Sequence, residues 1–278
     1  MFGDLSRVNT NSQAQQALSA FNRTNADLGM RQMRLATGSK LNRAEDDTAG
    51  FTIAKKLEAK VRGQAQALDN IADAKGLLTV AEGSLGSVMD ILQNMKAKSI
   101  QAANDTMGAD ERTAIANELA ALASEIDSII ENTDFNGQKL LDGTGGSNGD
   151  GTFTFQVGSA SGDTFTTVAL DISALQGLAF DVSDNAAASA EIDNIDGYIA
   201  ALSAMISGVG DDQKALTFKS ENLETAMNNY DAARSRIADA DFAKEQMQIV
   251  KLQILQQTGV ASLAQANQAP QAVLSLLR

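Results

Sequence analysis

The amino-acid sequence predicts a mainly α-helical protein: an elongated rod of long antiparallel helices in a coiled-coil-like bundle, with a small β-hairpin patch at its tip. Pro270 is the only proline among 278 residues, so almost nothing interrupts a helix. Apolar residues recur with heptad spacing over long stretches of the middle of the chain. Both ends carry uncharged runs rich in glutamine and asparagine, which indicates that the N- and C-terminal helices pair with each other.

The composition excludes several classes of functional site. The chain has no cysteine and no histidine, which rules out disulfides, thiolate nucleophiles and Ser-His-Asp triads. We expect no catalytic residues, no cofactor and no metal. The net charge of −13 is unevenly distributed. Residues 1–62 carry ten basic and six acidic side chains, and residues 231–278 carry five basic and four acidic ones. Residues 63–230 carry seven basic and 25 acidic side chains. An acidic middle repels nucleic acid, so we expect no nucleic-acid partner.

The C-terminal stretch 252–277 contains no charged residue. Its length suits a membrane span, but seven glutamine and asparagine side chains would be costly in hydrocarbon, so we expect no membrane partner. The helical wheel of this stretch and of the residues just before it lacks one clean apolar stripe. It shows two ridges: one of Met247, Val250 and Ile254, and another of Ile249, Leu252 and Leu255. Two interpretations remain at this point: a buried helix of a monomeric core, or a segment that packs into an assembly of copies of the chain.

The N-terminal segment lacks the basic start and continuous apolar run of a secretory signal. Residues 8–22 form a second uncharged run, and Phe21, Leu28 and Leu35 follow at intervals of seven, which predicts a helix with a narrow seam. After Gly38 we expect an irregular connector with internal ion pairs. Its carboxylates at 45–47 allow a metal site, but their spacing fits no EF-hand loop and favours a solvated turn.

Three long helices are predicted in the middle of the chain. The first begins at Leu57 and keeps five heptads; the second opens at residue 110 after a turn and runs antiparallel to it. Eight glycines between 137 and 162, with alternating apolar residues that end in the run Phe165, Val168 and Leu170, then predict two or three short hairpins up to about residue 180. The third helix, expected to be the longest, keeps its apolar register from Ile192 to Ile237 across Gly208 and Gly210.

Several segments resemble bacterial flagellin. They are residues 8–11 (VNTN), 34–38 (RLATG), 44–50 (AEDDTAG), 134–137 (DFNG), 233–237 (ARSRI), 239–241 (DAD) and the closing 253–278 (QILQQTGVASLAQANQAPQAVLSLLR). The resemblance covers roughly 1–142 and 190–278. The closing segment distinguishes flagellin from the hook–filament junction proteins of the same organelle, which remain the alternative. Residues 143–185 are too few for the extra outer domains of larger members, so the chain resembles a minimal flagellin.

The resemblance implies a structural subunit, not an enzyme, that self-assembles into the extracellular helical filament used for swimming. It implies an inner-tube domain of residues 1–47 with 238–278, and a rod domain of residues 48–237. It further implies passage through the type III export apparatus without a cleaved signal peptide, an export chaperone, and contacts with hook-associated and cap proteins. The residues expected to pack between subunits are Phe21, Leu28, Leu35, Ile249, Leu252, Leu255, Val260, Leu263, Leu274 and Leu277.

The resemblance also implies recognition by host immune receptors. Residues 34–54 resemble the peptide read by plant receptors, with Asp46, Asp47 and Gly50 retained. The animal receptor reads the middle helices, where activating members carry an arginine and a leucine at the positions of Asn94 and Lys98, although Glu118 matches. We therefore expect weak or absent activation of the animal receptor.

Overall fold

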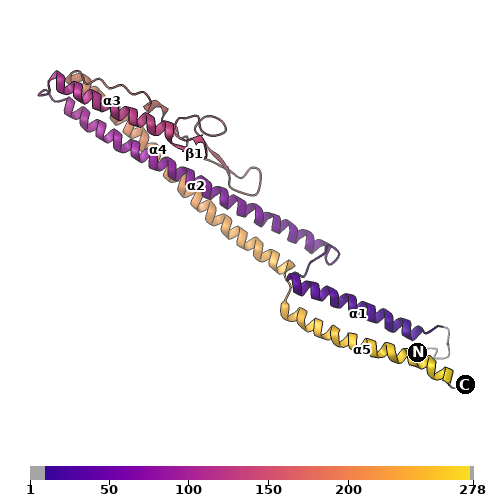
Figure 1. Ribbon diagram of the computed structural model, residues 1–278. Coiled ribbons are helices and arrows are strands. Elements are labelled where there is room, and N and C mark those ends of the chain that lie inside the picture. The colour runs from indigo at the N-terminus through magenta and orange to yellow at the C-terminus, as the bar shows by residue number, and fades with distance from the viewer. Residues whose placement is uncertain (1–9, 276–278) are drawn as a thin grey trace. The chain divides into compact units, whose positions relative to one another are not determined.

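The computed structural model describes residues 10–275, with side chains described up to residue 268. Contacts divide the chain into two units: residues 1–59 with 229–278, and residues 60–228. The expected division after residue 47 and before residue 238 stays a prediction. Long helices make up most of both units, which confirms the mainly α fold (Figure 1).

The first unit contains the antiparallel pair α1 (Ser12–Thr37) and α5 (Phe242–Ser275). Asn11 caps α1 by accepting a hydrogen bond from the Ala14 N–H at 3.0 Å. Side-chain contacts define the direction of the pair, because residue numbers rise along α1 as they fall along α5. They are Asn11 to Ala266, Gln256 to Asn25 and Arg31 to Glu245, at 2.8, 2.8 and 2.9 Å. The predicted pairing of the terminal helices is confirmed.

The second unit contains most of α2 (Thr48–Ala102) and α4 (Asn185–Ala238), with all of α3 (Ala109–Asn132). Lys75 contacts Thr217 at 3.1 Å and Glu82 contacts Gln213 at 2.8 Å, so α2 and α4 are antiparallel. Contacts between α2 and α3 show the same inverse order, as predicted: Lys98 with Glu118 at 2.7 Å and Ser84 with Thr133 at 3.1 Å.

A continuous apolar core runs along these three helices. From Ile71 to Met95 the heptad positions predicted on α2 are buried, and they pack with the apolar faces of α3 and α4 in one cluster, whereas Leu57 at the predicted start is half-buried. Its main members are Ile71, Leu78, Leu85, Leu92, Met95, Leu119, Ile126, Ile130, Ile195, Leu202, Val209 and Leu216. The helix α4 passes through Gly208 and Gly210 without a break, as its apolar register predicted.

The β patch consists, within residues 10–275, of two short antiparallel hairpins. Strands β1 (Asp134–Phe135) and β2 (Gln138–Lys139) flank a turn in which Asn136 and Gly137 have positive φ angles of 52° and 77°, conformations that asparagine and glycine tolerate best. Strands β3 (Thr154–Gln156) and β4 (Thr164–Thr166) pair with Phe155 opposite Phe165. A short 3₁₀ helix, η1 (Ser173–Leu175), packs near α3.

Three details of the sequence prediction were wrong. Helix α2 begins at Thr48 rather than Leu57, because Asp47 accepts a hydrogen bond from the Gly50 N–H at 3.0 Å and thereby starts the helix nine residues earlier. The longest helix is α2, with 55 residues against 54 in α4. The strand expected to continue to Leu170 ends at Thr166, after which Leu170 enters the core as part of a loop.

We expect Leu85→Ala to lower the free energy of unfolding of the monomer by about 2–5 kcal/mol, because the side chain is fully buried and its removal leaves a cavity. Urea unfolding followed by circular dichroism would measure the change. Val80→Ala on the exposed side of the same helix is the matched control and should change stability by no more than about 0.5 kcal/mol. Equal effects of the two substitutions would contradict the assigned core.

Candidate assembly surface

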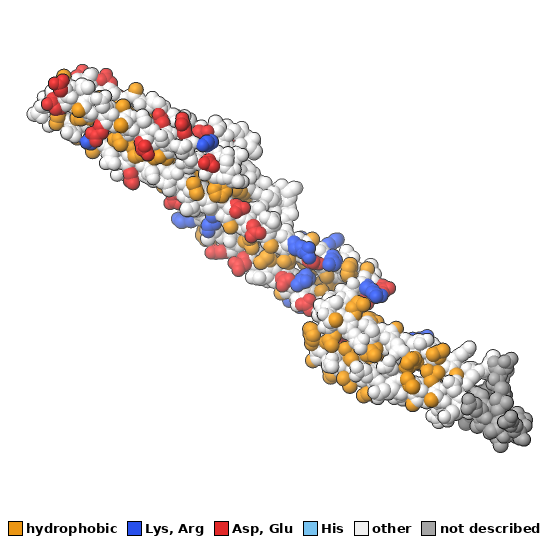
Figure 2. Space-filling view, in the orientation of Figure 1, with side chains coloured by type: hydrophobic (Ala, Val, Ile, Leu, Met, Phe, Trp, Pro, Cys, Tyr) orange, Lys and Arg blue, Asp and Glu red, His pale blue; other side chains and the backbone are white. Residues whose placement is uncertain are grey.

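A large set of apolar side chains on the α1–α5 pair is exposed. Figure 2 shows hydrophobic side chains gathered over these two helices. We call this set the outer apolar surface; it comprises Leu18, Met30 and Met33 of α1 with Phe242, Met247, Val250, Ile254, Leu255 and Val260 of α5. Exposed apolar side chains in this number on two paired helices favour a role in interaction.

The outer apolar surface exists because a pair of helices buries only one face of each. Of the two ridges predicted on α5, the one of Ile249, Leu252 and Leu255 faces α1 only in part: Ile249 is buried and Leu252 half-buried, but Leu255 is exposed. The other ridge, Met247, Val250 and Ile254, is exposed along its whole length. Helix α5 thus carries a complete apolar ridge that the rest of the described chain leaves uncovered.

The residues expected to pack between subunits divide into two groups. Six of them line the side on which α1 and α5 meet and are buried or half-buried: Phe21, Leu28, Leu35, Ile249, Leu252 and Leu263. Leu255 and Val260 belong to the outer apolar surface. Leu274 and Leu277 lie outside the residues whose side chains are described. The role of all ten residues between subunits stays a prediction.

A cluster of charges joins α1, α5 and the connector. Arg31 Nη1 donates hydrogen bonds to both carboxylate oxygens of the buried Glu245, at 2.9 and 3.0 Å. Arg34 lies between two carboxylates, 3.9 Å from Glu245 and 3.6 Å from Asp46. The sequence analysis did not identify this cluster. Its signal in the sequence was Glu245, the one acidic residue within the bounds of α5, together with two arginines near the end of α1.

The connector of residues 38–47 is held by backbone hydrogen bonds to the end of α4 and to the link between α4 and α5. The N–H of Lys40 donates to the Ala238 carbonyl at 2.6 Å, and the N–H of Ala240 donates to the Gly38 carbonyl at 2.9 Å. Gly50 is buried, and a Cβ at this position would lie 2.5 Å from the Asp47 carboxylate and 3.2 Å from Leu41. A larger residue would therefore disturb the start of α2.

The three consecutive carboxylates of the connector point to separate partners. Glu45 pairs with Arg43 at 3.0 Å, Asp47 caps α2, and Asp46 accepts hydrogen bonds from the N–H groups of Asn42 and Arg43, both at 3.1 Å. These bonds, first that from Arg43, together with the charge of Arg34, hold the pKa of Asp46 below its ordinary value of 3.8. Among the described residues no group of three or more acidic side chains could hold a metal ion.

The other residues expected to meet a receptor lie in the second unit. Lys98 of α2 and Glu118 of α3 form an ion pair at 2.7 Å, and exposed Asn94 lies one helical turn before Lys98. The structure thus brings Lys98 and Glu118 together on neighbouring helices. Asp46, Asp47 and Gly50 form a separate group in the connector and at the start of α2.

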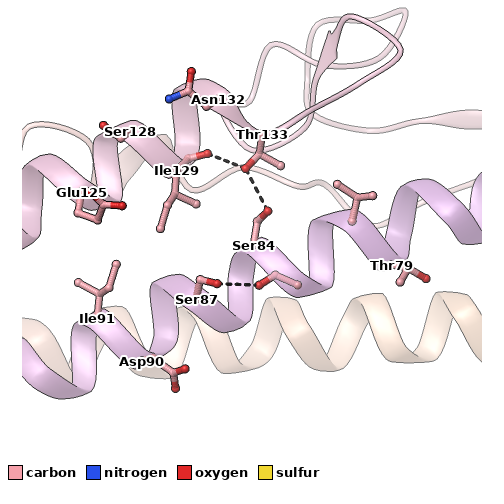
Figure 3. Close-up of a pocket in the computed structure, with 12 residues that line it drawn as sticks. Thr79, Ser84, Ser87, Asp90, Ile91, Glu125, Ser128, Ile129, Asn132 and Thr133 are labelled. Carbon is pink, nitrogen blue, oxygen red and sulfur yellow. Dashed lines mark hydrogen bonds between the residues drawn. The ribbon is translucent and has the colours of Figure 1, made fainter.

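A groove of about 810 Å³ lies between α2 and α3 and was not predicted from the sequence (Figure 3). Hydroxyl groups line it, but Thr133 Oγ1 contacts the Ile129 carbonyl at 2.6 Å and Ser84 at 3.1 Å, and Ser87 donates to the Gly83 carbonyl at 3.2 Å. Asp90 and Glu125 are exposed at its edges. Among the described residues no base contacts these hydroxyls, so the groove does not show the geometry of an activated nucleophile.

The helices within residues 10–275 are too short or too polar to cross a membrane.

Comparisons with known proteins identify two matching family regions. Residues 8–145 match the bacterial flagellin N-terminal helical region, and residues 192–277 match the bacterial flagellin C-terminal helical region. A flagellin of Halalkalibacterium halodurans is 40% identical over 259 residues, which cover 91% of this chain and 93% of that protein. The flagellar filament 33 kDa core protein of Treponema phagedenis is 33% identical, covering 98% of this chain and 99% of that protein. A crystal structure of Bacillus cereus flagellin shares 32% identity, with a TM-score of 0.44, over 58% of this chain and 88% of that chain.

We expect acid to loosen the connector through Asp46. Its folded pKa is lowered, so its contribution to stability is complete above the unfolded value of 3.8 and is lost as pH falls through the folded value. Hydrogen exchange of residues 38–50 should therefore accelerate as the pH is lowered from about 5 to about 3, after correction for the intrinsic exchange rate. In Asp46→Asn the exchange should already be faster at neutral pH and depend less on pH. Asp27→Asn, at an exposed carboxylate of α1, is the control, and an identical response from both variants would refute the role of Asp46.

Proposed function

Because this chain belongs to the bacterial flagellin family and is a structural subunit of the flagellar filament, we propose that its copies join through the outer apolar surface of the α1–α5 pair. The observation that carries this proposal is the exposed ridge of α5, Met247, Val250 and Ile254, which α1 leaves uncovered. A second copy is the partner that self-assembly supplies. Nothing in the matched families and relatives favours the alternative of a hook–filament junction protein.

The chemistry of the α1–α5 pair suits burial among copies. Beyond Lys251, α5 has no charged residue among the described positions, so its burial leaves no charge without a partner. The amide side chains of α5 can pair with those of a neighbouring helix, as Gln256 does with Asn25 of α1 at 2.8 Å. Contacts between different faces of identical chains, with a rotation that does not close, produce an open helical polymer.

The distribution of charge supports a division of roles between the units. Residues 63–230 carry most of the acidic side chains, which repel one another and remain hydrated. We assign residues 1–47 and 238–278 to an inner tube, and residues 48–237 to an outer layer that faces water. This arrangement places the nearly neutral helices where copies are closest and the acidic helices where copies meet solvent.

Export and attachment follow from the same role. The proposal includes an extracellular location, passage through the type III export apparatus without a cleaved signal peptide, an export chaperone, and contacts with hook-associated and cap proteins. The absence of cysteine supports passage as an unfolded chain, because no disulfide has to be broken or formed. The role is structural and includes no catalysis, nucleic acid or membrane partner.

We expect the double variant Leu255→Gln with Val260→Gln to remain a folded monomer and to lose filament formation. Both side chains are exposed in the chain, at 45% and 53%, so the fold should tolerate the change. Burying one leucine or valine contributes about 1.5–3 kcal/mol, so the critical concentration for assembly should rise at least about tenfold. Sedimentation and electron microscopy after acid depolymerisation and salt-induced reassembly would measure this rise.

The control for this experiment keeps the apolar chemistry: Leu255→Met with Val260→Ile should assemble like the parent chain. Circular dichroism of all three proteins would establish that the monomers remain helical. Normal filaments from the glutamine variant would exclude this part of α5 from the contacts between copies. A parent chain that stays monomeric at every concentration would count against the assembly role itself.

The receptor proposal concerns Asn94, Lys98 and Glu118. Lys98 pairs with Glu118 at 2.7 Å, so it engages the acidic residue and presents a charge where activating members have an apolar contact. We expect weak activation of the animal receptor by this chain in a cell reporter assay, and a gain of at least about tenfold for Asn94→Arg with Lys98→Leu. Asn117→Ala, at an exposed position beside Glu118, serves as the control. A full response to the unchanged chain would refute the proposal.

A further inference from the structure

The methionines of the chain are unevenly exposed. Three of the eight described methionines are exposed, Met30, Met33 and Met247 at 38%, 40% and 66%, and all three belong to the α1–α5 unit. The other described methionines are half-buried or, in the case of Met95, completely buried in the core of the second unit. Thioethers open to solvent are therefore concentrated on the surface that we assign to assembly.

The three exposed methionines lie at one level of the helix pair. Arg31 contacts Glu245, and Asn25 contacts Gln256 at 2.8 Å, so the antiparallel register places Met247 at the axial level of Met30 and Met33, on the side of α5 that α1 leaves uncovered. Met30 and Met33 also line a hollow of about 460 Å³, together with Ala26, Gly29 and residues of the connector. We call Met30, Met33 and Met247 the methionine band.

We propose that the methionine band is a modification site, at which peroxide or another oxygen-donating oxidant converts the thioethers to sulfoxides and thereby prevents assembly. This inference rests on the proposed function. A sulfur lone pair attacks one oxygen of the peroxide, the O–O bond breaks, and an S–O bond forms. The sulfur is oxidised by two electrons, and the peroxide is reduced to water, which carries away the proton of the transferred oxygen.

The consequence follows from burial. A methionine sulfur is apolar and adaptable, and it packs well between helices, whereas a sulfoxide is polar and requires a hydrogen-bond partner when water is removed. Three sulfoxides at one level of the helix pair would have to be desolvated in each subunit contact. The core should escape this chemistry, because Met95 has no exposed surface and oxidants cannot reach it without unfolding.

The experiment uses the full chain as a monomer, treated with hydrogen peroxide and then tested for assembly. Peptide mass spectrometry would locate the sulfoxides, and sedimentation would give the critical concentration. We expect Met30, Met33 and Met247 to be oxidised well before Met95, and the critical concentration to rise at least tenfold. Reduction by methionine sulfoxide reductases should restore assembly, since the modification is reversible.

Variants assign the effect to individual sites, with assembly expressed relative to the same variant before treatment. Met30→Leu with Met33→Leu and Met247→Leu should make assembly insensitive to peroxide. Met205→Leu, at a half-buried methionine of the second unit, should leave the sensitivity of the parent chain unchanged. Complete oxidation of the band without a rise in critical concentration would overturn the inference, and so would equal sensitivity of the triple variant.

Two further outcomes separate this inference from the proposed function. If the triple variant does not assemble before treatment, the test of the inference is the reductase experiment on the oxidised parent chain. Recovery of assembly after reduction of the sulfoxides supports the inference. Complete reduction of the sulfoxides without recovery of assembly overturns it. If the untreated parent chain forms no filaments, the proposed assembly role fails first. Assembly of the untreated chain together with insensitivity to peroxide overturns only the role of the methionine band.

Discussion

A pair of helices can bury only one face of each helix, and this constraint determines the character of the terminal unit. Helix α5 has two apolar ridges, and α1 covers part of the one that contains Ile249 and Leu252. The ridge of Met247, Val250 and Ile254 therefore stays exposed in the single chain. Subunits of a flagellar filament supply one another with the surface that a monomer lacks, so an unsatisfied apolar ridge is consistent with this role.

The second unit buries its heptad core by itself, although Ile100 and Phe218 remain exposed. Three helices and the β patch enclose the heptad positions of α2, and Leu78, Leu85 and Leu92 are completely buried. A core of this kind can hold its fold without other subunits, whereas the α1–α5 pair depends on few buried residues and on the ion pair between Arg31 and Glu245. The two units therefore divide the work: one keeps its own structure, and the other carries surface for contacts between copies.

The charged cluster around Glu245 gives direction to an otherwise neutral pair. Amide and apolar contacts alone would allow α1 and α5 to slide by a turn, since similar side chains recur along both helices. The buried carboxylate of Glu245 contacts Arg31 at 2.9 Å and lies 3.9 Å from Arg34, so a register that moves it away from both arginines would leave a buried charge without a partner. The same register places the three methionines of the band at one axial level of the pair.

The sequence by itself determined the helices, the antiparallel bundle and the pairing of the two ends, because heptad spacing and uncharged runs are local patterns. It also predicted both apolar ridges of α5. Only the tertiary structure decided which ridge faces α1, that Glu245 meets Arg31 from 214 positions away, and that Asp47 starts α2 at Thr48. The physical reason is that burial and ion pairing depend on which elements meet, and periodicity along one helix does not contain that information.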